Sequence, residues 1–450
     1  MKSREYVENQ IRTHFTLNEI LDLLIKSQAL LVGGFIRDLF FGCTSYDMDI
    51  VCPENSRALA LEIAQKLEGT FIELDCENEI YRVVLKDKTT CFDISTALEG
   101  DILKDAKRRD FTVNSIFYDF KNGCLFDPCA GADDLAAGIL KTADIKNLFD
   151  DPLRMLRVFR FKALYDFRIQ DEILEFVKKN RTLINSVAKE RINQELLKLF
   201  GGKYAPEALF KADECGLLEE IFPFVKEIKK IPKNTHHHLD LFHHSIETMR
   251  QIRLDNPLLK LAAFCHDIGK PQTHTIKPSG RHRFIGHDDL GSKLVRPLLK
   301  ELKFSKKQID YVSLMIKNHI YPSALMSAPV VQDKAKVRFV RKLYPYVEDI
   351  IELARADRLS ARGPMVSDDM VRENLKNLEE LKEFYYKIKP TLEVMPKLLD
   401  GREIMEILGI GPSKKLGKII EALKEAQIEG KIKTKEEAEM FVKSGFWDVL

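Results

Sequence analysis

The sequence predicts a small α/β unit followed by a long all-α body. Short apolar runs alternate with helical periods before residue 145, and strand signals nearly vanish after it. Amphipathic helical periods then follow one another as far as residue 450. Because hydrophobic residues make up 45% of the 450 residues, the chain can form several packed cores and disorder is not expected.

The elements of the α/β unit follow from hydrophobic periodicity. We expect an amphipathic helix over residues 16–29, and the apolar run "ALLVGG" predicts a strand that ends in a glycine turn. The segment "FIRDLFFG" predicts a short helix stopped by Gly42, and "YDMDIVC" predicts a strand because apolar residues alternate with aspartates. A helix over 56–68 and strands at "TFIEL", "EIYRVVLK" and "TCFDIST" complete the unit.

The body reads as helix after helix, and "RGPMVSDDM" near residues 362–370 is the only segment typical of a linker. Ten of the eleven histidines lie between residues 236 and 319, which marks a region of different chemistry. The chain is therefore divided into a head, a helical neck, a histidine-rich domain and a helical tail. The expected boundaries are 1–140, 141–230, 231–365 and 366–450.

Charge, cysteine usage and hydropathy exclude several classes. Lys+Arg 71 against Asp+Glu 69 gives a net charge of +2, so a nucleic-acid-binding surface would have to be local. Eight cysteines without a C-x-x-C pair argue against a zinc ribbon or thioredoxin-like site and favour reduced thiols. The N-terminal stretch lacks the apolar core of a signal peptide, and no window is apolar enough to span a bilayer. We expect a soluble cytoplasmic protein without a membrane partner.

Two aspartates at alternate strand positions are the first candidate site. Asp47 and Asp49 would share one face of the strand with Cα atoms about 6.5–7 Å apart, which suits one or two metal ions. A polar strand edge explains this pair alone equally well. Upstream, however, Gly33 and Gly34 expose backbone N–H groups at a helix start, and Arg37 follows on its first turn. A phosphate cradle followed by a carboxylate pair is the layout of metal-assisted nucleotidyl transfer.

The motif "GGFIRD…DMD" resembles the signature of the DNA polymerase beta-type nucleotidyltransferases. In particular it resembles that of the class II, bacterial-type tRNA nucleotidyltransferases (the CCA-adding enzymes) and the related bacterial poly(A) polymerases. The resemblance implies a polymerase beta-like nucleotidyltransferase head with a small mixed sheet, and Mg²⁺ held by the two aspartates. Asp93 in "CFDIS" is our candidate for the third carboxylate of such a site, the alternative being an ordinary strand-end aspartate.

Two further segments carry the resemblance. "KRRDFTVNSIFYD" (107–119) is similar to the family's ribose-recognition motif, which implies Arg109 near the triphosphate and Asp110 or Asn114 near the 2′-hydroxyl. "DPCAGADDLAAGIL" (127–140) is similar to the loop that follows, with Ala-Gly where the family often has Gly-Gly.

"DDPLRMLRVFRF" (150–161) resembles the family's base-reading helix, although Asp150 stands where the family usually has Glu. An Asp acceptor beside an Arg donor complements both cytosine and adenine, whereas guanine and uracil would leave buried charges unpaired. A helix with surface ion pairs is the alternative. The residues that would form the base-reading stripe are Asp151, Arg154, Arg157 and Arg160.

The histidine-rich region resembles the HD phosphohydrolase superfamily. This resemblance implies a site for a divalent transition metal (Mn, Ni, Fe, Co or Zn) and hydrolysis of phosphomonoesters or 2′,3′-cyclic phosphates. A lone histidine is more often a surface or core residue, but six matching positions in order make that alternative weak. The implied ligands are His244, His266, Asp267, His287, His319 and Asp357.

RNA binding is expected from two local basic segments. Residues 151–200 hold eleven Lys/Arg against seven Asp/Glu, and "GIGPSKKLGKIIEALKEAQIEGKIKTK" (409–435) opens a basic helix with a Gly-Pro turn. A solvated amphipathic helix explains the tail about equally well. We expect the tRNA acceptor arm to be recognised by shape and phosphates.

The expected function is addition of 3′-terminal nucleotides to tRNA from CTP and ATP. Only "ISTALEGDILKDAK" lies between Asp93 and Arg108, where full CCA-adding relatives usually carry a longer flexible loop, so we predict a CC-adding enzyme. The alternatives are a full CCA-adding enzyme, a poly(A) polymerase, an HD-domain phosphohydrolase or cyclic phosphodiesterase with an RNA-binding head, and a non-catalytic RNA-binding protein. The oligomeric state is not predicted.

Overall fold

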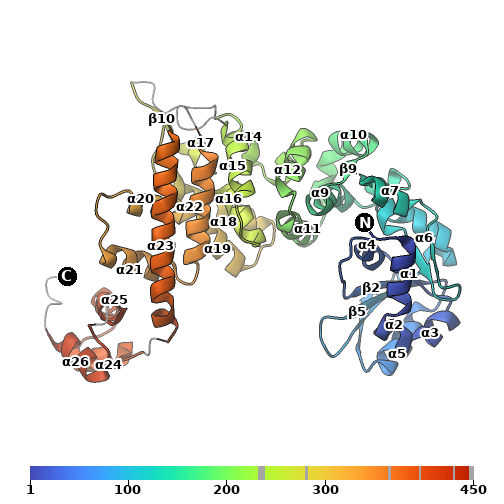
Figure 1. Ribbon diagram of the computed structural model, residues 1–450, viewed down its shortest axis with the longest axis horizontal. Coiled ribbons are helices and arrows are strands. Elements are labelled where there is room, and N and C mark those ends of the chain that lie inside the picture. The colour runs from blue at the N-terminus through green and yellow to red at the C-terminus, as the bar shows by residue number, and fades with distance from the viewer. Residues whose placement is uncertain (232–238, 279–281, 363–365, 395–396, 429–430, 445–450) are drawn as a thin grey trace. The chain divides into compact units, whose positions relative to one another are not determined.

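The structure is a computed structural model that describes residues 1–231, 239–278, 282–362, 366–394, 397–428 and 431–444. The chain forms two compact units, Met1–Pro223 and Phe224–Leu450. The first contains the predicted α/β head and several helices, and the second is almost wholly helical, so the predicted fold class is confirmed (Figure 1). The finer division into four domains stays a prediction.

A seven-stranded mixed sheet organises the head, with strand order β3-β4-β5-β2-β1-β6-β7. Strand β2 pairs in parallel with β5 and antiparallel with β1, and all other pairs in this sheet are antiparallel. The parallel pairing of β2 with β5 places Asp49 beside Asp93. The strands are β1 (Leu30–Val32), β2 (Asp47–Cys52), β3 (Thr70–Asp75), β4 (Ile80–Val84), β5 (Cys91–Thr96), β6 (Phe117–Asp119) and β7 (Cys124–Phe126).

Two of the three predicted helices of the head, α4 and α5, begin and end close to the predicted positions, whereas α1, α6 and α7 were not predicted. The helix expected over 16–29 is two helices, because Ile20 leaves the helical conformation with φ −110° and ψ 10°. Leu17, Ile20 and Leu24 are all buried in the core. The helical segments are α1 (Arg4–Arg12), α2 (Phe15–Glu19), α3 (Leu21–Lys26), α4 (Gly34–Phe40), α5 (Ser56–Lys66), η1 (Leu98–Gly100), α6 (Ile102–Arg108), η2 (Thr112–Asn114), α7 (Gly131–Ala137) and α8 (Lys146–Asp150).

The remainder of the first unit is helical and packs around α9, which contacts α11 and α12. Two-residue strands, β8 (Ile139–Leu140) and β9 (Arg168–Ile169), form a small parallel pair beside it. Sequence periodicity missed them because two residues carry no period. The helical segments are α9 (Leu153–Tyr165), α10 (Asp171–Asn180), η3 (Arg181–Ser186), α11 (Lys189–Gly201), α12 (Ala205–Glu214) and α13 (Leu217–Ile221).

The second unit holds the remaining helices and one hairpin, β10 (His274–Ile276) with β11 (His282–Phe284), which the sequence did not predict. Its last helices share a small core around Ile404, Ile419 and Val442. Part of the predicted linker, 363–365, lies outside the described residues, as do His236, His237 and His238. The helices are α14 (Phe224–Ile228), α15 (Leu241–Arg250), α16 (Pro257–Cys265), α17 (Lys270–Thr273), α18 (His287–Glu301), α19 (Lys306–Asn318), α20 (Tyr321–Met326), α21 (Asp333–Leu343), α22 (Val347–Ser360), α23 (Asp368–Val394), α24 (Gly401–Leu408), α25 (Lys414–Ile428) and α26 (Lys435–Lys443).

Within the described part of the chain, no helix is both long enough and apolar enough to cross a membrane.

Candidate active site and histidine cluster

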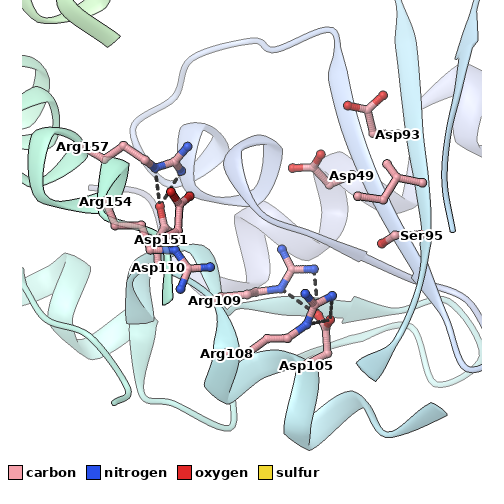
Figure 2. A pocket seen from close by; sticks show the side chains of 11 residues that line it. Asp49, Asp93, Ser95, Asp105, Arg108, Arg109, Asp110, Asp151, Arg154 and Arg157 are labelled. Atoms are coloured by element: carbon pink, nitrogen blue, oxygen red, sulfur yellow. Dashed lines mark hydrogen bonds and ion pairs between the residues drawn. The ribbon is translucent and has the colours of Figure 1, made fainter. Parts of the chain in front are cut away.

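The aspartates of β2 and β5 meet at a cavity of about 350 Å³ in the first unit (Figure 2). Parallel pairing places Asp49 directly beside Asp93 and Asp47 beside Cys91. Asp49 and Asp93 line the cavity, whereas Asp47 is exposed and accepts a hydrogen bond from the Cys91 thiol. The predicted carboxylates therefore gather on two adjacent strands.

The glycine turn before α4 fits closely against Asp49. Gly33 has φ +86°, and a Cβ atom there would lie 2.4 Å from Oδ2 of Asp49. The Gly34 N–H donates a hydrogen bond to the same carboxylate. Glycine is thus required at position 33 both by backbone conformation and by close approach. In this structure the predicted phosphate cradle positions a carboxylate.

Burial raises the pKa of the Asp49 carboxyl to about 6, and the negative charges of Asp93 and Asp47 add to this effect, while Arg109 opposes it. Such crowding of carboxylates is unfavourable without cations. Asp93 has a cation of its own, because Arg82 donates two hydrogen bonds of 2.7 Å to its two oxygens. The set of oxygen ligands and the cost of ionising Asp49 both fit a divalent metal ion at this edge of β2.

Arginines line the cavity opposite these carboxylates. Figure 2 shows Arg108 and Arg109 reaching toward it from the C-terminal end of α6, and Arg154 and Arg157 from α9. Arg109 was predicted to lie near a triphosphate, and it does border the same cavity as Asp49. The cavity therefore has one acidic wall and, opposite it, a wall of four arginines interspersed with Asp105, Asp110 and Asp151, which we call the basic wall. Arginines facing carboxylates across a cavity suit a metal-bound polyphosphate.

The predicted ribose-binding and phosphate-binding residues form a buried polar network. Arg37 is 9% exposed; it donates to Asp38 and, over 2.6 Å, to Oδ1 of Asn114. Asn114 donates to Asp110, and Asp110 accepts two further hydrogen bonds from Arg157. Arg37 is not among the residues that line the cavity. In the described structure these residues hold one another, and their roles toward a nucleotide stay predictions.

The base-reading residues separate into two groups. Asp151 and Arg154 line the cavity; Arg154 donates over 2.8 Å to the Asn147 carbonyl oxygen, and Asp151 pairs with Arg191 at 2.7 Å. Arg160 instead turns inward and pairs with Glu195 at 2.9 Å. Asp151 and Arg154 therefore border the same cavity as Asp49, and their role in base reading stays a prediction.

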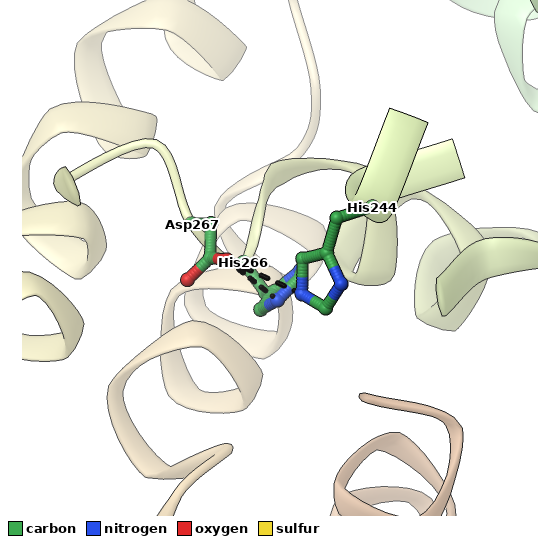
Figure 3. Close-up of side chains that lie close together, drawn as sticks. All are labelled: His244, His266 and Asp267. Carbon is green, nitrogen blue, oxygen red and sulfur yellow. Dashed lines mark ion pairs between the residues drawn. The ribbon is translucent and has the colours of Figure 1, made fainter. Parts of the chain in front are cut away.

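The six predicted metal ligands of the second unit converge in one cluster. Their ligand atoms form three overlapping groups, each within 4.8 Å, and these groups are His244/His266/Asp267, His266/His319/Asp357 and Asp267/His287/His319. Figure 3 shows the first group, in which Nε2 of His266 lies 3.1 Å from Oδ2 of Asp267. Asp267 belongs to two groups, so its two oxygens face different sets of histidines.

Backbone carbonyls orient the imidazoles of this cluster. Nδ1 of His266, His287 and His319 lies 2.7–2.8 Å from the carbonyl oxygens of Ala263, Phe284 and Ile316. Such a contact makes Nδ1 the protonated nitrogen and leaves Nε2 as the ligand atom. Nε2 of His266 is buried without a hydrogen bond, and Oδ2 of Asp267 is paired with Nζ of Lys270 at 2.6 Å. Burial lowers the pKa of His319 to about 4, which keeps its ring neutral. The donor set fits a divalent transition metal.

Comparisons with known proteins agree with this geometry. Residues 29–141 match the Poly A polymerase head domain, 166–229 the probable RNA and SrmB- binding site of polymerase A, and 236–362 the HD domain. The chain is 31% identical to the A-adding tRNA nucleotidyltransferase of Deinococcus radiodurans over 92% of this chain and 94% of the relative. This chain belongs to the tRNA nucleotidyltransferase family. The CC-adding tRNA nucleotidyltransferase of Thermus thermophilus is also 31% identical, over 91% of this chain and 92% of the relative.

Solved structures of the family share the fold. An apo CCA-adding enzyme superposes with a TM-score of 0.63 at 23% identity, covering 98% of this chain and 95% of that chain. The Bacillus stearothermophilus CCA-adding enzyme in complex with CTP gives 0.62 at 20% identity, covering 96% and 98%. The predicted polymerase beta-like head and HD-containing body of a tRNA nucleotidyltransferase are thereby confirmed.

Several residues at the cavity of this tRNA nucleotidyltransferase escaped sequence reasoning. Asp105 holds Arg108 and Arg109, and the i,i+3 and i,i+4 spacing on a helix was a signal that could have found it. Arg82, Arg191 and Glu195 pair with site residues that lie 11 to 40 positions away in the chain. No local pattern predicts such pairs.

Proposed function

We propose that this tRNA nucleotidyltransferase adds cytidines to the 3′ end of tRNA from CTP and stops before the terminal adenosine. The connection from β5 to α6 carries this proposal. It spans only residues 97–101 and is tied by hydrogen bonds from Gly100 to Ala97 (2.9 Å) and from Asp101 to Leu98 (3.0 Å). Ala97, the first residue of the connection, and Ala106, in α6, are buried in one core cluster. A short, anchored connection cannot rearrange as a long flexible loop can.

The proposed roles follow the two walls of the cavity. Arg109 binds the triphosphate, while Asp151 and Arg154 pair with the amino group and ring nitrogen of cytosine. Asp47 and Asp49, with Asp93, would hold Mg²⁺, which when bound supplies charge neutralisation for attack of the tRNA 3′-hydroxyl on the α-phosphate. The acceptor arm of tRNA is the proposed second substrate, bound by shape and phosphate contacts along the neck and tail.

Primer extension tests this proposal. Three tRNA substrates, ending before C74, after one C and after both, are incubated with CTP, ATP or both, and the products are separated at single-nucleotide resolution. We expect two cytidines on the first substrate, one on the second and nothing on the third. An adenosine on the third would contradict CC-only addition. Growth of long tails from ATP alone would indicate a poly(A) polymerase instead.

A-adding activity is the second candidate, because the relatives reported above include an A-adding and a CC-adding protein at the same identity. The same assay separates the two. An A-adding enzyme extends only the substrate that already ends in CC, and it uses only ATP. Full CCA addition extends all three substrates.

For the histidine cluster we propose a divalent transition metal and hydrolysis of phosphomonoesters or 2′,3′-cyclic phosphates. The buried Nε2 of His266, which has no hydrogen bond, and the convergence of the six ligand side chains support this proposal. His319→Ala should lose bound metal and hydrolysis, whereas His274→Ala, outside the cluster, should retain both. Nucleotide addition should survive in each variant. Full metal content in His319→Ala would refute the ligand assignment.

A further inference from the structure

Asp105 is a buried carboxylate that the proposed reaction does not yet use. It lies on α6 with 0% exposure. Its Oδ1 accepts from Arg108 at 2.7–2.8 Å and its Oδ2 accepts from Arg109 at 2.9–3.0 Å. Figure 2 shows both guanidinium groups held beside it at the floor of the basic wall. One carboxylate thus fixes two cavity-lining cations, and the guanidinium of Arg109 also lies over the ring of Phe117.

Asn147 connects this basic wall with the base-reading residues. Its side chain is 4% exposed and donates over 2.7 Å and 2.9 Å to the carbonyl oxygens of Lys107 and Arg109. Its own carbonyl oxygen accepts the hydrogen bond from Arg154. One residue of α8 therefore joins the backbone that carries Arg109 to the side chain of Arg154.

We propose that Asp105 and Asn147 are positioning residues that together set the separation between the triphosphate-binding arginine and the base-reading arginine. Asp105 fixes the orientation of the Arg109 guanidinium group, and Asn147 fixes the distance from that group to the guanidinium group of Arg154. A nucleotide is a ligand of defined length, so this separation decides whether its base meets the Asp151/Arg154 pair when its phosphates are bound. The inference rests on the proposed nucleotide-binding function.

The two residues should have different effects when changed. Asp105→Asn leaves two adjacent guanidinium groups without a shared anion, so phosphates bind less well whatever the base. We expect the KM for CTP and the inhibition constant of inorganic triphosphate both to rise about tenfold, with kcat changed less than threefold. The preference for CTP over UTP should stay as in the wild type.

Asn147→Asp keeps the shape of the side chain but removes the amide group that donates both hydrogen bonds. The carboxylate that replaces it faces two carbonyl oxygens and can only accept. We expect the ratio of kcat/KM for CTP to that for UTP to fall about tenfold. Inhibition by inorganic triphosphate, which has no base to place, should change less than threefold. This opposite signature is not expected from general loss of folding.

Matched controls separate positioning from structural damage. Asp22→Asn removes an exposed helical carboxylate that pairs with Lys66, and Asn180→Asp removes an amide donor to a backbone carbonyl in α10. Both should behave as the wild type. Because Asp105→Asn could unfold, Asp105→Glu provides a second variant that keeps the charge but shifts the guanidinium groups of Arg108 and Arg109. We expect it to weaken phosphate binding in the same way and to leave the preference for CTP over UTP unchanged.

The measurements on each variant either support or overturn the proposed positioning roles. Wild-type triphosphate inhibition in both folded Asp105 variants, or wild-type CTP preference in folded Asn147→Asp, would overturn the proposal. A wild-type protein that incorporates no nucleotide into tRNA would overturn the proposed function instead, and triphosphate or CTP binding by the variants would still test the positioning roles.

Discussion

Asp49 illustrates how a single carboxylate becomes suited to metal binding. Its position on β2 follows from strand periodicity, but its chemistry depends on neighbours that are distant in sequence. Gly34 donates to it, Asp93 lies beside it across the parallel pair, and burial raises its pKa to about 6. The protein thus pays a folding cost at neutral pH to keep an ionised group where a cation can neutralise it.

The Asp49 shift predicts a dependence of stability on pH. The unfolded chain ionises this group near its ordinary value of 3.8, whereas the folded chain ionises it only near 6. The contribution of Asp49 to the free energy of unfolding is therefore most favourable at low pH. It declines as pH rises from about 4 to about 6, and it stays unfavourable above that. In chelator at neutral pH, Asp49→Asn should gain on the order of 2 kcal/mol in urea unfolding while losing nucleotide addition. Asp47→Asn, at an exposed position, should gain less than about 0.5 kcal/mol. Equal stability of Asp49→Asn and wild type would contradict the predicted cost.

The same shift predicts that activity falls as pH drops through about 6, because protons compete with the metal ion for Asp49. Raising the Mg²⁺ concentration should move the acidic limb of the rate profile to lower pH. A limb that does not respond to Mg²⁺ would assign it to another group.

Gly33 provides a sharp test of close packing. Gly33→Ala would put a Cβ atom 2.4 Å from the Asp49 carboxylate at φ +86°, so the carboxylate must move. We expect nucleotide addition to fall by about a hundredfold or more and stability by about 1–2 kcal/mol. Gly138→Ala is the matched control, since Gly138 also has positive φ (+65°) but nothing lies within 4 Å of its added Cβ. It should lose about 1 kcal/mol of stability and keep its activity.

At the scale of elements, helix α6 joins the short connection after β5 to the arginines of the cavity. The helix starts at an N-cap, Asp101, whose side chain accepts from the N–H groups of Leu103 and Lys104 at 2.8 Å and 3.2 Å. It ends at the two arginines of the basic wall. The cap and the buried Ala106 therefore hold both ends of a seven-residue helix that is too short to be stable alone.

Removal of this cap should affect both stability and substrate binding. Asp101→Ala should cost about 1 kcal/mol in unfolding free energy and raise the KM for CTP severalfold, because a frayed α6 no longer fixes the arginines. Ser3→Ala removes the comparable cap of α1, which accepts from Tyr6. It should cost a similar free energy and leave the KM unchanged. A KM that responds equally to both would reduce the effect to global destabilisation.

At the scale of the whole molecule, the chain consists of two compact units, each with its own candidate site. The carboxylate and arginine cavity belongs wholly to Met1–Pro223, and the histidine cluster belongs wholly to Phe224–Leu450. Each unit has its own buried residues, so each is expected to unfold as a cooperative body.

Ligands should therefore stabilise the two units independently. In scanning calorimetry, CTP with Ca²⁺ in place of Mg²⁺ should raise one transition, and Ni²⁺ or Mn²⁺ at low concentration should raise the other, each by several degrees. His319→Ala should abolish the second shift only. A single transition that responds to both ligands would show that the units unfold together.

Local sequence patterns predicted most of the elements and the residue types of both candidate sites. Strand alternation located Asp47 and Asp49, and glycines and proline marked the turns. The resemblance to the HD superfamily implied all six members of the second cluster. These features are local, because periodicity and turn chemistry act over a few residues. The two-residue strands and the break at Ile20 were missed, since they depend on packing rather than on local propensity.

Which side chains face the cavity, and which form ion pairs with one another, depends on how the strands and helices pack in the folded chain. Arg37 and Arg160 carry the same charge as Arg109 and Arg154, yet burial against Asp38 and Glu195 turns them into internal partners. Asn147 and Arg82 contact residues of the site that lie far from them in the sequence, and no local pattern displays such contacts. A buried charge must be paired, and the partner is chosen by the packing of strands and helices that meet only in the folded chain.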